Sequence, residues 1–518
     1  MLAAQAARVD SAPPVIKAIE IERANVFGVD ETNNFLLRLA NKLHATTRAW
    51  VIRREVLLRP GERWDSARVA ESARNLRGLG VFRRVEIDSV RTDSGMVLRV
   101  RTGDAWSTRV EPRFSGAGNQ RVYAIALGEV NLAGTASEVR LRYDKRPDRD
   151  LYTALFRRPR LIGQKIGVLT QYQLRSDGHS IYGSIGEPYF TLKSQSAWNV
   201  SAEDRDIRVL RFFNGNTKTA GDSLQQRFAH VTATVGKALF ANDHGYLRVG
   251  LLGQIRRENF AGRARLDTIG RSVFGVVGVY GQWRRARFQV RRGFQGFSRD
   301  EDVDLSTIVQ AGVNLTPRAF GYQQDGFVPS VSARVGLEIP HGFITLNAAA
   351  LARITDAGWV DTGSVHVGGT LALLPSKRQI AVFHAAAGWQ RHPEPGAEFD
   401  LGLGIGPRAF DQHSFTGDRA FFLSAEYRYQ IKEEFLRNAG VALAAFTDYG
   451  GAWYAGSPRR TGFDYGVGLR FGLTRTTGPE TTRIDFARLA GSDIERSRWR
   501  LVIGRGFAFS LNGRLDGQ

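Results

Sequence analysis

Side chains that could carry out catalysis or bind a metal ion are few in this sequence and unfavourably spaced. Gly178–Gly183 places a serine beside a histidine, as a serine hydrolase needs, but the spacing is not Gly-x-Ser-x-Gly and the context is a strand. The 9 histidines include no His-Glu-x-x-His or comparable zinc spacing. No spacing in the sequence identifies a pair of carboxylates that could act as general acid and general base. We therefore predict that the protein is not an enzyme and needs no cofactor or metal ion.

Two further features of the sequence exclude particular kinds of binding site and catalysis. The run Gly402-x-Gly404-x-Gly406 lacks the strand–helix–strand context of a nucleotide-binding loop. Cysteine is absent, which excludes disulfides, thiol catalysis and cysteine-ligated metals. The function therefore has to be sought in the architecture of the chain.

From about Trp106 to Phe509 the sequence repeats runs of about ten residues in which apolar and mainly polar positions alternate. Val331–Ile339 and Phe421–Tyr429 are clear examples. Alternate side chains of a strand point to opposite faces, so one face is apolar and the other is charged. So many strands, without a helical domain of similar size, predict a closed barrel with its apolar face in lipid and its polar face toward water.

The predicted fold is mainly β. Division of the repeat by ~25 residues per strand and connection gives about sixteen antiparallel transmembrane strands. No stretch approaches the ~18–20 consecutive apolar residues of a spanning helix. The formal net charge of +21 raises the alternative of a soluble protein that binds nucleic acid or polyanions. We predict no nucleic-acid partner, because the arginines are spread along strand faces, as at Arg140 and Arg142, and form no basic helix or tail.

Residues 15–103 follow a different pattern, which predicts a compact α+β module of order β-α-α-β-β. A helix is predicted from Asn33 to Leu43, and a second is capped by Asp65-Ser66 and ends at Gly78-Leu79-Gly80. Two strands, Phe82–Val90 and Met96–Arg101, form a hairpin. Residues 1–14 are predicted to be disordered or the remnant of a signal peptide, because Ala4-Gln5-Ala6 resembles the end of a cleavage site. An ordinary alanine-rich terminus is the alternative.

The module resembles a POTRA domain, the periplasmic unit of the Omp85 superfamily. The similarity lies in Val51–Glu55, Pro60-Gly61-Glu62 and Glu71–Val85. Residues 104–509 resemble the barrel of the same superfamily, of the BamA/TamA-like, bacterial surface antigen type, and residues 510–518 form a C-terminal tail. The motifs that carry this second resemblance are Asn131–Thr135, Pro407–Phe410, Phe415–Gly417, Ser424–Arg428 and Asp448–Trp453.

The resemblance also implies a candidate site. In the family, the arginine of a loop folded into the lumen pairs with acids of the wall, and here this implies Arg408 with Glu426 and Asp448, next to Phe410. The alternation independently places Glu426 on the polar face. Such a contact could latch the loop and set the barrel conformation, or it could be an ordinary ion pair that supports folding.

The sequence departs from the family pattern in two places. Ala409 replaces a glycine, and a loop that needed positive φ there would be strained. Phe507 and Phe509 have the pattern of a terminal barrel strand, but Ser510–Gln518 follow.

The resemblance implies an outer-membrane protein that assists insertion or translocation of polypeptides. Its module would lie in the periplasm and capture substrate, and its barrel would pass the substrate on, with no catalytic residue. Its expected partners are polypeptide substrates, outer-membrane lipid and periplasmic accessory proteins. The alternative is an outer-membrane pore, receptor or structural barrel that keeps the fold without translocase activity.

Overall fold

The computed structural model describes residues 14–28, 35–92, 95–117, 120–161, 165–212, 222–262, 272–297, 300–435, 438–476, 481–491 and 496–509. Strands hold 66% of the chain and helices 7%, which confirms the mainly β class. The predicted terminal segments, 1–14 except Pro14 and 510–518, lie outside the described residues. The chain divides into two compact units. Unit 1 is Met1–Thr108, Val130–Ser137 and Arg475–Thr477, and unit 2 is the remainder.

Unit 1 is a three-stranded sheet with three helices. Its elements are β1 (Ile16–Ala24), α1 (Phe35–Leu43), α2 (Ala49–Glu55), α3 (Ser66–Gly78), β2 (Phe82–Thr92) and β3 (Gly95–Asp104). The sheet order is β1-β3-β2, with β1 parallel and β2 antiparallel to β3. The prediction of two helices was wrong, because α2 was missed. Seven residues without a side-chain cap give little helical periodicity, although Val51, Ile52 and Glu55 are buried.

The third helix starts where its sequence predicts. Asp65 accepts hydrogen bonds from the backbone N–H groups of Ala67 and Arg68, which would otherwise have no partner at a helix start. Ser72 and Leu76 face the core, and the helix ends at Gly78, two residues before Gly80 adopts φ +74°. Its inner face contributes Leu76 to an apolar core shared with Leu58 and Leu98.

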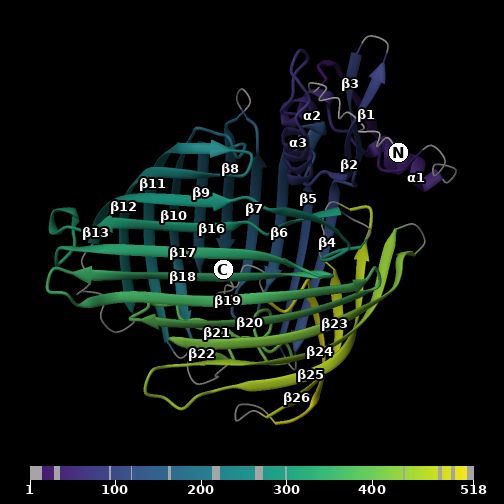
Figure 1. Ribbon diagram of the computed structural model, residues 1–518. Coiled ribbons are helices and arrows are strands. Elements are labelled where there is room, and N and C mark those ends of the chain that lie inside the picture. The colour runs from purple at the N-terminus through teal and green to yellow at the C-terminus, as the bar shows by residue number, and fades with distance from the viewer. Residues whose placement is uncertain are drawn as a thin grey trace, which may run out of the picture. The chain divides into compact units, whose positions relative to one another are not determined.

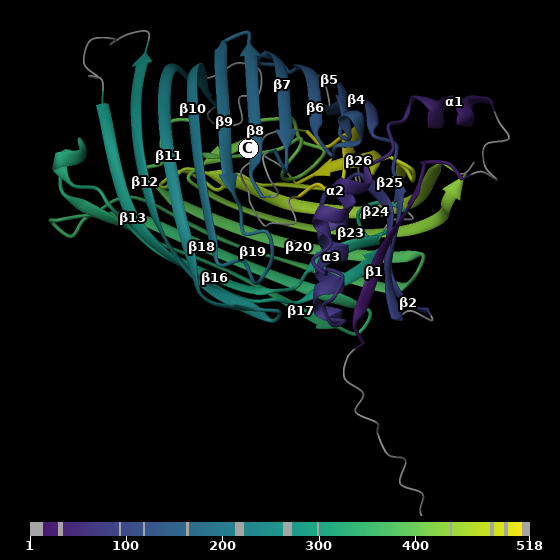
Figure 2. The ribbon, with the colours of Figure 1, turned by 90° about the horizontal axis from the view of Figure 1, so that it is seen from above.

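Unit 2 is one large antiparallel sheet with two small hairpins. The strands of the sheet are β4 (Thr108–Ala117), β5 (Gln120–Glu129), β6 (Glu138–Lys145), β7 (Asp150–Arg158), β8 (Gly167–Arg175), β9 (Gly178–Glu187), β10 (Ser196–Arg211), β11 (Asp222–Asn242), β12 (Gly245–Gly262), β13 (Ser272–Arg285), β16 (Thr307–Leu315), β17 (Gly326–Ile339), β18 (Gly342–Thr355), β19 (Val360–Ser376), β20 (Gln379–Arg391), β23 (Arg419–Phe435), β24 (Ala439–Trp453), β25 (Gly462–Leu473), β26 (Thr482–Ala490) and β27 (Trp499–Arg505). The hairpins are β14 (Phe288–Arg292) with β15 (Asp300–Asp304), and β21 (Phe399–Leu401) with β22 (Phe415–Gly417). Figures 1 and 2 show the sheet strongly curved, with its strands side by side.

The strand order in the described residues holds twenty strands, where about sixteen were expected. The expectation assumed too much chain per strand, because β6 to β9 have only 8, 9, 9 and 10 residues. In the described residues, the order returns from β27 to β4 through a single bridge, Ile503 with Gly116, supported by an ion pair between Arg505 and Glu111 at 3.1 Å. We call this contact the seam. The sheet curls until its edges touch, but it is not closed by a continuous ladder.

The two faces of the sheet differ as the alternation predicts. On β23, Leu423 and Tyr427 are 45% and 42% exposed, whereas Ser424 and Glu426 on the other face are buried. Exposed apolar side chains continue over the outer face, for example Val467 on β25 and Leu251 on β12. A continuous exposed apolar surface of this extent is suited to lipid. In the described residues, no helix is long and apolar enough to cross a membrane.

The last described residues do not extend the final strand. The pattern of Phe507 and Phe509 predicted that they belong to the last strand, but β27 ends at Arg505. Gly506 has φ +60° and donates its N–H to the carbonyl of Thr481, which turns the chain. Phe509 is buried and stacks on His384 of β20 with ring centroids 4.3 Å apart. Residues 506–509 therefore turn to the inner face, because their aromatic rings find partners there.

An arginine in place of Val467, near the middle of β25, tests whether the outer face contacts hydrocarbon. Because the guanidinium would have to leave water, Val467→Arg should reduce the free energy of folding into lipid vesicles by about 2–4 kcal/mol. Denaturant titration in vesicles measures this difference. Val467→Ala is the control for loss of the apolar side chain, and equal stability of the two variants would contradict a lipid-facing wall.

Candidate functional site

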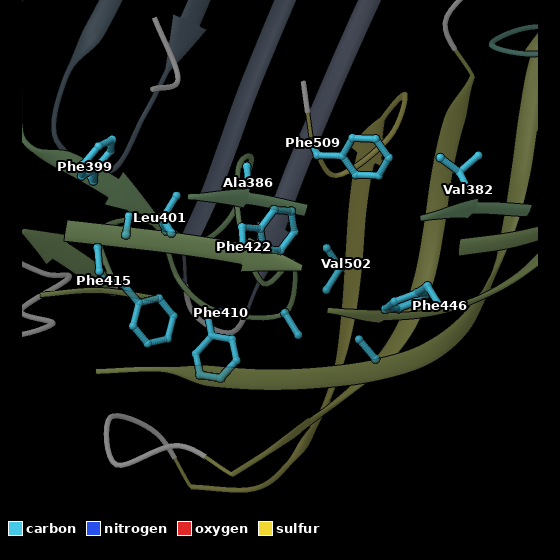
Figure 3. Packing of buried hydrophobic residues seen from close by; sticks show 14 of the residues in the cluster. Val382, Ala386, Phe399, Leu401, Phe410, Phe415, Phe422, Phe446, Val502 and Phe509 are labelled. Atoms are coloured by element: carbon cyan, nitrogen blue, oxygen red, sulfur yellow. The ribbon is translucent and has the colours of Figure 1, made fainter. Parts of the chain in front are cut away.

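The candidate site is formed by the connection between β20 and β23, residues 392–418, which we call the inner loop. It contains β21 and β22, and its residues pack against buried side chains of the inner face (Figure 3). Gly402, Gly404 and Gly406 have φ of +150°, +114° and +111°, and a Cβ on Gly402 would lie 2.1 Å from the carbonyl oxygen of Asp411. The glycine run noted in the sequence therefore serves to fold this loop tightly.

Arg408 lies at the centre of the site and is fully buried. Its Nε and Nη2 donate to the two carboxylate oxygens of Asp448, at 2.5 and 3.2 Å. Its Nη1 donates to Glu426 at 2.8 Å and to Asp485 at 3.2 Å. The guanidinium carbon lies 3.8 Å from the ring centroid of Phe446. Paired Arg–carboxylate hydrogen bonds are strong and directional, so the arginine holds carboxylates of β23, β24 and β26 together.

The charge of Arg408 is stabilised by these neighbours. Burial alone would lower the pKa of its guanidinium, but Asp448, Glu426 and Asp485 raise the pKa well above its ordinary value. The arginine is therefore a permanent cation, and its function is structural or electrostatic.

A second arginine completes the network. Arg470 of β25 donates from Nε and Nη2 to Glu426 at 3.0 and 2.9 Å, and from Nη1 to Asp485 at 2.5 Å. Arg428 donates to Glu426 at 2.6 Å. Glu426 thus accepts hydrogen bonds from three arginines, which satisfies a carboxylate that would otherwise be costly to bury.

The structure brings the four residues of the implied site into one cluster. Arg408 contacts Glu426 and Asp448, and Phe410 follows two residues later, fully buried against Phe415 with ring centroids 5.1 Å apart. Sequence reasoning missed Asp485 and Arg470. The missed signal was the alternation in Thr482–Ala490, where buried Asp485 and Ala487 alternate with exposed Ile484 and Phe486.

The substitution at Ala409 causes no backbone strain of the expected kind. Ala409 does not have positive φ. Its N–H donates to Asp464 of β25 at 3.0 Å. Its carbonyl accepts a hydrogen bond from Arg500 of β27 at 2.7 Å. The loop therefore contacts every strand from β23 to β27 through side chains or backbone.

Unit 1 contains a second buried polar cluster that the sequence did not reveal. Ser107 Oγ lies 3.2 Å from Nδ1 of His44, and Nε2 of His44 lies 3.0 Å from Asp104. The Ser–His–Asp order resembles a hydrolase triad, but the serine is only 2% exposed, and Thr47 donates both its N–H and its hydroxyl to Asp104. Asn131, from the motif near β5, donates to the Thr47 hydroxyl at 2.9 Å. We interpret the cluster as structural.

Acidic and histidine side chains were the candidate ligands for a metal ion. In the part of the chain that the structure describes, no three His, Asp or Glu side chains gather in an arrangement that could hold a metal ion. The strongest concentration of charge is the arginine–carboxylate network.

Residues 402–507, which include the inner loop from Gly402 onward and β23 to β27, match the model of the Omp85 superfamily domain. The chain carries an Omp85 superfamily domain. This confirms the resemblance drawn from the motifs between Pro407 and Trp453.

Several solved structures are similar to this chain, each at low sequence identity. BamA from Haemophilus ducreyi lacking POTRA domains 1–3 has 11% identity and a TM-score of 0.40, covering 95% of this chain and 84% of that chain. CdiB from Acinetobacter baumannii has 11% identity and a TM-score of 0.44, covering 95% and 74%. CdiB from Escherichia coli has 11% identity and a TM-score of 0.45, covering 97% and 92%. No curated protein sequence matches the chain.

Removal of the central arginine should destabilise unit 2. Arg408→Gln leaves buried carboxylates without their counter-charge, a change that costs about 3–5 kcal/mol. Thermal unfolding in detergent, together with protease cleavage within the inner loop, measures the effect. Arg419→Gln, at an exposed position at the start of β23, is the matched control. If both variants unfold at the wild-type temperature, the network does not hold the loop.

Proposed function

We propose that the protein assists insertion of polypeptides into, or their translocation across, the bacterial outer membrane. The observation that carries this proposal is the Omp85 domain at residues 402–507, whose inner loop is held by the buried Arg408 network. The exposed apolar outer face supports a membrane location, and neither catalytic residues nor a cofactor are required. In this proposal unit 2 is a transmembrane barrel, and Arg408, Phe410, Glu426 and Asp448 form the latch that sets its conformation.

Unit 1 is proposed to be a single periplasmic POTRA-like domain that captures substrate. In its sheet, β2 is an edge strand, whereas the start of β1 is paired with the turn before α3 through Ile16 and Glu62. The edge of β2 therefore has the freer backbone groups in the described residues. An extended polypeptide can add to such an edge as a further strand, with main-chain hydrogen bonds that do not depend on sequence.

The seam is the proposed route for release into the membrane. Neighbouring strands β26 and β27 share a register of seven pairs, from Thr482 with Arg505 to Arg488 with Trp499. In the part of the chain that the structure describes, the seam has one bridge pair, and an ion pair between Arg505 and Glu111. Fewer hydrogen bonds have to break there than anywhere with a full register, so a strand could enter or leave at this place.

A structural or receptor barrel is the second candidate. The inner face of unit 2 holds a buried apolar cluster that includes Phe399, Phe410, Phe422 and Phe509 (Figure 3), so the described interior is packed with side chains. A filled interior favours a barrel that keeps the fold without passing a polypeptide.

Photocrosslinking in native outer membranes distinguishes these functions. A photoreactive residue at Arg84, on the edge strand β2, should form adducts with nascent outer-membrane or secreted polypeptides. The same residue at Ala70, on the exposed face of α3, serves as the control and should form few adducts. A folded protein that yields no polypeptide adducts from Arg84 would support the structural or receptor barrel instead.

Locking the seam tests the route of release. The chain contains no cysteine, so Gly116→Cys with Ile503→Cys introduces only one thiol pair, at the two residues that face each other across the seam. Oxidation should abolish most of the activity if substrate leaves through the seam, and reduction should restore it. Unchanged activity after complete cross-linking would place the route elsewhere.

A further inference from the structure

The inner loop contacts two walls of unit 2 that are far apart in the sheet. The part around Arg408 is held by β23 to β27, as described above. Its other part reaches β10 and β12, and eight strands lie between β10 and β23 in the strand order. The loop therefore crosses the interior, and we call its contacts with β10 and β12 the far-wall contacts.

The far-wall contacts centre on the end of β10. The ring of Phe212 stacks on His413 with centroids 3.7 Å apart and an angle of 5° between the planes. The Thr416 hydroxyl donates to the Phe212 carbonyl at 2.6 Å. His413 Nδ1 in turn lies 2.5 Å from a carboxylate oxygen of Asp400, which fixes the imidazole in the loop.

Ion pairs surround this stack. Arg211 donates to Glu398 at 3.2 Å, and Glu398 also accepts the N–H of Gly396 at 2.7 Å. Arg256 of β12 lies 3.4 Å from Glu394. Gly396 has φ +84°, and a Cβ there would lie 2.5 Å from Val209 of β10. The loop backbone thus approaches β10 as closely as a glycine permits.

The strand β22 fills the space between the walls. Phe415 and Thr416 are neighbours, so their side chains point in opposite directions. Thr416 reaches Phe212 on the far wall, whereas a Cβ on Gly462 of β25 would lie 2.6 Å from the ring of Phe415. The strand β22 therefore contacts both walls, one through each of these two residues.

The two ends of the loop are held with unequal strength. The side chains of Arg408, Glu426, Asp448 and Asp485 are fully buried. At the far wall, Arg211 and Arg256 are 28% and 27% exposed, and Glu394 is 54% exposed. Ion pairs that contact solvent are weak and screened by salt, whereas breaking a buried network is costly. The loop should therefore separate first from β10 and β12.

We infer that the path for water and small ions through unit 2 runs between the inner loop and the wall of β10 and β12, and that the Phe212–His413 stack closes it. Opening requires release of the far-wall contacts only, with Arg408 still bound. This inference concerns ion passage and goes beyond the proposed handling of polypeptides, so it can be tested without any substrate.

Single-channel recording in planar lipid bilayers tests the inference. Wild-type protein should be mostly closed, and Phe212→Ala should raise the open probability about tenfold. This factor corresponds to a loss of about 1.4 kcal/mol from the stability of the closed state, which is in the range of one aromatic stack. Val200→Ala, at an exposed position on β10, is the control and should leave the open probability unchanged. Equal open probabilities of folded wild-type and Phe212→Ala protein would overturn the inference.

A covalent link provides the reverse test and does not depend on a destabilising variant. Arg211→Cys with Glu398→Cys, joined by a short bifunctional thiol reagent, should hold the loop on the far wall and abolish openings. The unlinked double variant should open more often than wild type, because its ion pair is lost. If the linked protein conducts as freely as the unlinked one, the path does not run along β10.

Discussion

The cost of burying one positive charge governs the architecture of unit 2. Arg408 lies in a loop and not in a strand, and water cannot reach its guanidinium. Its charge can be kept only where several carboxylates converge, and these come from β23, β24 and β26. The loop therefore cannot fold into place until those strands are in register, and those strands cannot bury Glu426 and Asp448 without the loop. Loop and wall are stable only together.

Small residues on the inner face make this arrangement sterically possible. A Cβ on Gly468 of β25 would lie 2.1 Å from Asp485 and 3.0 Å from Arg470, and one on Gly466 would lie 2.9 Å from the Phe446 ring. Long charged side chains can lie flat on the wall because these positions have no side chain of their own. The fraction of the chain that matches the Omp85 domain, residues 402–507, is the part in which charge, loop and small residues depend on one another.

Much of the fold followed from local pattern, because a period of two reveals both faces of a strand. The outward position of Leu423 and the inward position of Glu426 could be predicted in this way. Features that depend on contacts between residues distant in sequence could not be predicted in this way. Asp485 was missed because its strand was not recognised, and the inward turn at Gly506 depends on partners such as His384, more than a hundred residues away. The helix α2 was missed because it is too short to show a period.

The short length of β27 has a consequence for the surrounding lipid. Its 7 residues rise about 23 Å, and a tilt of about 40° leaves about 18 Å of this along the membrane normal. The apolar band of an outer-membrane barrel is about 25 Å tall. β11, with 21 residues, exceeds that height. In the proposed barrel, a bilayer would meet its largest hydrophobic mismatch beside β27, the shortest strand of the sheet, and would have to thin there to match it. The membrane would then be easiest to perturb along the edge where, in the described residues, a single bridge joins the ends of the sheet.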